Sequence, residues 1–114
     1  MPRKEPAPAL DILTLEEFDA IDDRPEFPVL MPEWGNKNVI VQQPDAETAV
    51  MLQESCAGKD GQLDKLKFAC RLIYKCCKQP KFTPAHLDKL ATRNAKANLR
   101  LAAAIEHGGK KKEP

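Results

Sequence analysis

The stretch "EFPVLMPEWGNKNVIVQQ", residues 26–43, decides the fold because it contains the only strand-like runs in the chain. The runs "EFPVLMPEW" and "NVIVQQ" are joined by the turn signal "GNKN", which predicts a short antiparallel β-hairpin near residues 27–42. Pro28 and Pro32 lie four residues apart, so both remove an N–H from the same side of the first strand and leave its other side free to pair. Because a two-stranded hairpin is marginal in water, its apolar face is expected to pack against helices.

The single tryptophan of the chain, Trp34, comes directly before this turn. Aromatic residues make up 5% of the chain, so the placement of the largest one at the base of a turn needs a reason. We interpret Trp34 as a structural anchor that clamps the hairpin end onto the helices, worth about 3–5 kcal/mol relative to alanine when well buried. Its surroundings do not indicate a ligand-stacking role.

A short helix is predicted ahead of the hairpin, in "TLEEFDAI". Thr14 followed by Glu17 forms a capping box, and Leu15, Phe18 and Ile21 then fall on one face. The connector "DDRPE" ends this helix, because a proline disfavours helical geometry at the residue before it.

The chain after the hairpin predicts further helices with polar breaks between them. They are expected over about residues 45–57, within the broadly apolar segment 62–79, and from Thr83, which caps a helix with Pro84 at its first position. A break near residues 92–94 divides the last helical segment.

The predicted fold is therefore mainly α (α+β), with four to five helices and one short antiparallel β-hairpin. A chain of 114 residues forms one domain at most. We assign residues 1–11 to a flexible N-terminal tail, residues 12–107 to a single helical domain with the hairpin, and residues 108–114 to a flexible charged tail.

Charge divides the chain into two unlike halves. Residues 1–57 carry twelve acids and four bases, a balance of −8, whereas residues 58–114 carry fourteen bases and five acids, a balance of +9, which together give the net charge of +1. This uneven distribution of charge has more than one explanation. Acidic and basic faces can complement each other within one fold. They can also attract one copy to another head to tail, or provide a basic face for an acidic partner. The sequence leaves these interpretations open.

No arrangement of residues indicates catalysis, a cofactor or a metal site. The chain contains no Gly-rich phosphate loop, nucleophile elbow or H-E-x-x-H motif, so we expect no catalytic residues and no enzyme. A zinc site from Cys70, Cys76, Cys77 and His86 is disfavoured, because adjacent cysteines on a helix point about 100° apart and the usual C-x2-C pair is missing.

Neither a membrane span nor a secretory signal is predicted. No apolar run approaches the roughly eighteen residues that a membrane helix requires. The N-terminal "MPRKEPAPALD" is proline-rich where a secretory signal has an apolar segment, so a cytoplasmic location is expected.

A basic row in the second half raises the question of nucleic-acid binding. On a helix, Lys67, Arg71, Lys75 and Lys78 follow one another along one ridge, as a phosphate-binding helix requires. The solvent face of any amphipathic helix carries such a ridge, and no base-reading motif accompanies it. A small DNA-binding regulator is therefore kept only as a minor alternative.

The segment "LTLEEFDAIDDRPEFPVLMPEWGNKNVIVQ" resembles the tail assembly chaperones of long-tailed (siphovirus-type) bacteriophages and prophages. These proteins carry a "T-L-E-E-F" helix, a "D-D-R-P-E" connector, a strand ending "V-P-E-W-G" and a second short "V-x-V" strand. The corresponding positions here are Thr14–Phe18, Asp22–Glu26, Met31–Gly35, Val39 and Val41. "KFTPAHLDKL" is similar to a later helix start of the family, whereas "KCCKQP" departs from the acidic loop that many relatives have there.

The resemblance implies a protein that coats the tape measure protein, a long helical ruler, and keeps it soluble until tail tube subunits assemble around it. It implies self-association, an indirect link to the major tail protein, action in the host cytoplasm and absence from the mature virion. Another virion-morphogenesis adaptor or structural protein is the alternative. No cofactor is implied.

The family also implies a longer partner form made by programmed ribosomal frameshifting. Gly109, Lys110 and Lys111 lie in "GGKKK", which slippery codons can encode. A solubilising lysine tail explains the same residues, and only the gene sequence distinguishes the two.

The candidate residues fall into two sets. Those that carry the resemblance are Thr14, Leu15, Phe18, Pro32, Glu33, Trp34 and Gly35. Those that we expect in the core or in contact with a partner are Leu66, Ile73, Tyr74, Leu101 and Ile105. The sequence does not say which of the second set are core.

Overall fold

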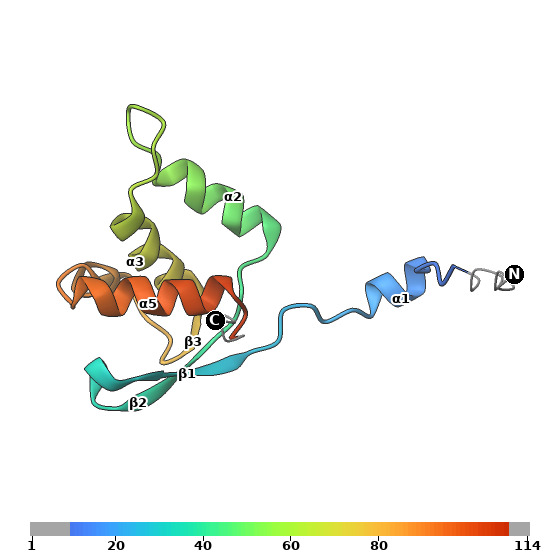
Figure 1. Cartoon of the computed structure of the whole chain (residues 1–114), viewed down its shortest axis with the longest axis horizontal. Helices are drawn as coiled ribbons and strands as arrows, with labels where there is room; N and C mark the ends of the chain where they lie inside the picture. The colour runs from blue at the N-terminus through green and yellow to red at the C-terminus, as the bar shows by residue number, and fades with distance from the viewer. Residues whose placement is uncertain (1–9, 110–114) are drawn as a thin grey trace, which may run out of the picture.

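The structure is a computed structural model that describes residues 10–109. Its elements are α1 (Leu15–Asp19), β1 (Phe27–Met31), the 3₁₀ helix η1 (Pro32–Trp34), β2 (Lys37–Val41), α2 (Ala46–Ser55), α3 (Lys65–Cys76), β3 (Cys77–Gln79), α4 (Pro84–Leu90) and α5 (Ala95–Glu106). Helix α5 packs against α3 and β1, α2 and α4 pack against α3, and α1 stands apart from the sheet (Figure 1). This arrangement confirms the predicted α+β class with five α-helices.

The hairpin forms as predicted, but it belongs to a three-stranded antiparallel sheet of order β1-β2-β3. In this order β1 pairs only with β2, so β1 is an edge strand. Phe27 pairs with Val41, and Met31 pairs with Lys37. The third strand was not predicted, because its residues were assigned to the end of the preceding helix. Cys77 is extended at φ −80° and ψ 124°, and Pro80 follows too closely for the helix to resume.

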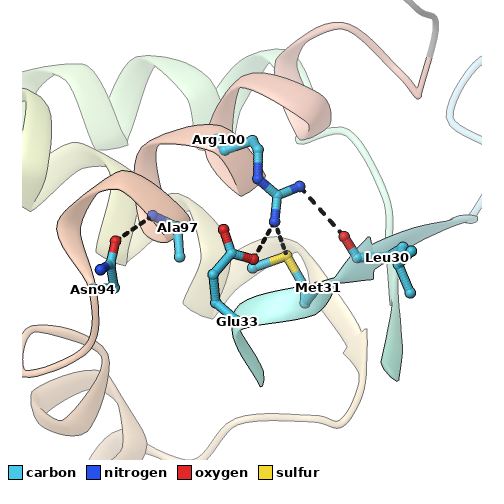
Figure 2. Close-up of polar contacts among 6 residues, drawn as sticks. All are labelled: Leu30, Met31, Glu33, Asn94, Ala97 and Arg100. Carbon is cyan, nitrogen blue, oxygen red and sulfur yellow. Dashed lines mark hydrogen bonds and ion pairs between the residues drawn. The ribbon is translucent and has the colours of Figure 1, made fainter. Parts of the chain in front are cut away.

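Local capping signals place the helix ends. Asp45 accepts a hydrogen bond from the backbone N–H of Thr48 at 2.8 Å and begins α2. Thr83 precedes Pro84 at the start of α4. The predicted break separates α4 from α5, which begins when Asn94 Oδ1 accepts from the N–H of Ala97 at 3.0 Å (Figure 2).

The core lies where α3 and α5 meet the inner face of the sheet. α3 contributes Leu72 and Ile73, and α5 contributes Leu101 and Ile105, all of them almost completely buried. The sheet contributes Met31, Val39 and Val41. The hairpin therefore gains its stability from helices, as its length requires.

Residues 10–22 project from this body as an arm that includes α1 (Figure 1). No residue of α1 is buried. The chain measures 66 × 37 × 33 Å along its principal axes, and the arm lies along the longest of them. Residues 12–22, which we assigned to the helical domain, thus lie outside the packed body.

The C-terminal end of α5 is closed by two glycines with left-handed backbone, Gly108 at φ +66° and Gly109 at φ +79°. A Cβ atom on Gly109 would lie 2.6 Å from Cδ2 of Phe27, so only glycine fits against β1 there. These two residues, which we assigned to a flexible tail, therefore belong to the body. Lys110 and Lys111 lie outside the described residues.

No helix in residues 10–109 combines the length and the apolar character that crossing a bilayer demands.

Two residues of α3 test the placement of the core. Ile73 is fully buried, so Ile73→Ala should lower the free energy of unfolding by about 2–5 kcal/mol. Leu66 is 48% exposed, and Leu66→Ala should change the free energy of unfolding by no more than about 0.5 kcal/mol. Urea unfolding followed by the fluorescence of Trp34 measures both. Equal effects of the two substitutions would contradict this core.

Candidate functional site

The residues of the "PEWG" motif form the turn of the hairpin. Pro32, Glu33 and Trp34 make η1, and Gly35 follows with a left-handed φ of +81°, which glycine adopts without strain. Trp34 is half-buried and packs against the core, in the position that an anchor of the hairpin end requires. The most recognisable segment of the sequence therefore has a structural role in this fold.

Arg100 of α5 holds this turn from outside (Figure 2). Its guanidinium bonds the carboxylate of Glu33 and donates to the carbonyl of Leu30 at 3.3 Å and to Sδ of Met31 at 3.6 Å. A hydrogen bond from its own backbone N–H and one from Arg100 lower the pKa of Glu33. Since Pro28 has no N–H and the Leu30 carbonyl is occupied, the outer edge of β1 offers little to another strand.

A groove of about 440 Å³, here called groove A, lies between α3, α4 and α5. Leu66 and Leu87 give it apolar walls, and Lys67, Arg71 and Arg93 give it a mostly cationic rim. Asn98 lies at its floor, 2% exposed, and its Nδ2 donates to the carbonyl of Leu90 at 2.8 Å. The Oδ1 atom of Asn98 has no partner among the described residues.

A second groove of about 280 Å³, here called groove B, lies between α2, α3 and α4. Its apolar lining includes Met51, Tyr74 and Leu87, and its cations are Arg71 and Lys75. The Lys75 Nζ atom lies 5.9 Å from the centre of the Tyr74 ring. Because Arg71 and Leu87 line both grooves, the two adjoin on one side of the body.

A third hollow, here called the acidic hollow, lies at the base of the arm. It has a volume of about 660 Å³, and Leu63, Phe68 and Leu72 give it an apolar part. The charged residues that line it are Asp23, Arg24, Asp45 and Glu106. Its charge is therefore opposite to that of groove B.

The candidate contact residues separate into two groups. Ile73, Leu101 and Ile105 are completely buried and belong to the core. Leu66 is 48% exposed in groove A, and Tyr74 is half-buried in groove B. A partner can reach the second group without unfolding the body.

The predicted basic row is interrupted. Lys67, Arg71 and Lys75 lie on α3 and border the grooves, but α3 ends at Cys76, so Lys78 lies on β3 instead of the same helical ridge. Sequence reasoning named Glu33 as part of the family signature but missed its partner Arg100, which lies 67 residues away. No local pattern joins residues so distant, and only the packing of α5 on the hairpin brings them together.

The four cysteines are buried free thiols within the body. Burial raises the pKa of Cys76 and of Cys77 to about 11. Within residues 10–109, no group of three or more His, Cys, Asp or Glu side chains is placed to hold a metal ion. Buried thiols of this kind act as small apolar residues.

Comparisons of the chain with protein-family models, with curated proteins and with solved structures gave no match. The geometry of the arm and grooves is therefore the structural basis for a functional proposal.

The thiols make stability depend on alkaline pH. A free thiol has a pKa near 9 and Cys76 and Cys77 have about 11, so the folded state holds more protons between these values. The stabilisation is complete below pH of about 9 and is lost as pH rises toward about 11. Unfolding midpoints in urea should fall over this range, and the fall should be smaller in a Cys76→Ala, Cys77→Ala double variant. An unchanged fall in that variant would assign it to other groups.

Proposed function

We propose that this protein is a phage tail assembly chaperone that binds the tape measure protein, keeps it soluble in the host cytoplasm and associates with other copies of itself. The resemblance of residues 13–42 to that family supports the proposal. The structural observation that supports it is groove A, an accessible groove with apolar walls and a mostly cationic rim.

Groove A suits an amphipathic helix. Leu66 is half-exposed beside Leu87, and such side chains accept the apolar stripe of a helix laid along the groove. Lys67, Arg71 and Arg93 then meet acidic side chains at the flanks of that stripe, while Asp64 and Asp88 restrict the register. A long helical ruler presents many such stripes, so many copies of a small protein can cover it.

Masking apolar helix surface requires no catalysis. The chaperone holds its client by reversible burial of apolar area, and the tube subunits displace it when they bury that area permanently. The proposed role therefore requires that the body have a stable core, an exposed groove and good solubility.

Co-expression with the tape measure protein of the same phage tests the proposal. The wild-type chain should raise the soluble fraction of the tape measure protein and co-purify with it. Leu66→Asp places a charge on an apolar wall of groove A and should lower the recovered complex by about tenfold or more. Leu99→Asp is the matched control, because Leu99 is 40% exposed on α5 and does not line groove A.

Three results would contradict the proposal. One is failure of the wild-type chain to increase tape measure solubility. Another is an equal loss of binding in Leu66→Asp and Leu99→Asp. The last is recovery of the protein from finished virions at the abundance of a structural component, which favours an adaptor role.

A further inference from the structure

The arm exposes large apolar side chains at a far higher density than the rest of the described chain. Residues 10–22 contain six of the twelve exposed large hydrophobic side chains in residues 10–109. Leu10 is 85% exposed, Leu15 82% and Phe18 60%. Exposed apolar surface so concentrated marks a binding element.

A capping box holds the start of α1 within the arm. Thr14 Oγ1 accepts from the N–H of Glu17 at 3.1 Å, and the Glu17 carboxylate accepts from the N–H of Thr14 at 2.9 Å. This capping box fixes Leu15 and Phe18 three residues apart on one face of α1. A helix of five residues is marginal by itself, because short helices gain most of their stability from packing. Covering the apolar face of α1 would therefore stabilise it.

Charge decides which surface receives the arm. Residues 10–22 carry five acids, Asp11, Glu16, Glu17, Asp19 and Asp22, and no base. The acidic hollow at the base of the arm is lined by three carboxylates and one arginine, so it repels the arm of its own chain. Groove B has Arg71 and Lys75 and no carboxylate among the described residues that line it.

Groove B also provides apolar surface for the arm. Met51 is 56% exposed, and Tyr74 and Leu87 are half-buried beside it. The apolar side chains of Leu15 and Phe18 match this apolar lining, and Glu16 and Asp19 are opposite in charge to the two cations at the rim.

We propose that the arm of one copy docks into groove B of a second copy, with α1 laid on the groove and its acids against Arg71 and Lys75. The two surfaces are different parts of the chain, so the contact is head-to-tail and leaves one free arm and one free groove B in every dimer. Copies can therefore continue to add. This inference deepens the proposed self-association and rests on it, but it does not depend on binding of the tape measure protein.

The expected contact is weak when isolated. The arm supplies 13 residues (10–22), about half of the roughly 20–30 residues per side in a standard stable interface. Leu66, Lys67 and Arg93 of groove A stay accessible beside the docked arm, since only Arg71 and Leu87 line both grooves. A helical client that crosses several neighbouring copies then adds avidity to the weak arm contacts.

Two single-surface variants provide the test. Phe18→Asp disables the arm but keeps groove B, and Met51→Asp disables groove B but keeps the arm; both side chains are exposed, so folding should be retained. Circular dichroism melts check that retention. Sedimentation equilibrium of the full chain over about 5–500 µM brackets the affinity expected of so small an interface.

Wild type should form a concentration-dependent series of oligomers, and its association should weaken with added salt. Each variant by itself should remain monomeric, with association weakened by about tenfold or more. An equimolar mixture of the two should form one-to-one dimers and nothing larger, because only one arm and one groove remain intact. Leu99→Asp, which lies outside both surfaces, should associate as wild type does.

Four outcomes would overturn the inference. They are a monomeric wild type over the whole range, association unaffected by either variant, no dimer in the mixture, and dimers that form in Phe18→Asp alone. A monomeric wild type is also the result expected if the arm folds onto the body of its own chain. Because these measurements contain no tape measure protein, solubilisation of that client can succeed or fail independently of them.

Discussion

The packing of α5 against both α3 and the hairpin is the interaction on which the rest of the structure depends. Leu101 and Ile105 fill the space between Ile73 and the inner face of the sheet, and all three side chains are fully buried. A strand pair as short as β1 and β2 does not persist alone, so the helices decide whether it forms. The same helix carries Arg100, which fixes the turn from outside and occupies the edge of β1.

Features set by neighbouring residues could be predicted from the sequence, and features set by distant ones could not. The hairpin, the Thr14 capping box and the helix start at Pro84 each follow from residues within a few positions of one another. The strand β3 forms because Cys77 is extended and pairs with β2. This tertiary pairing overrides the helical pattern of the local sequence.

The candidate site shows the same division. Helical spacing put Leu66 and Ile73 on one stripe, yet Ile73 is buried under α5 and Leu66 borders an open groove. A helical wheel gives the direction of a side chain but not how far the neighbouring helix extends over it. The arm was likewise visible as an amphipathic acidic helix, while its separation from the body depends on contacts that the pattern does not contain.

The close approach of Gly109 to Phe27 fixes where anything appended to this chain would emerge. Gly109 is the last of the described residues and lies against the sheet, so ribosomal slippage just after it would leave residues 10–109 unchanged. An extension would leave beside the first residue of β1, on the side from which the acidic arm departs. The long and short products of the proposed frameshift would then share one folded body, and the added segment would begin beside the start of β1.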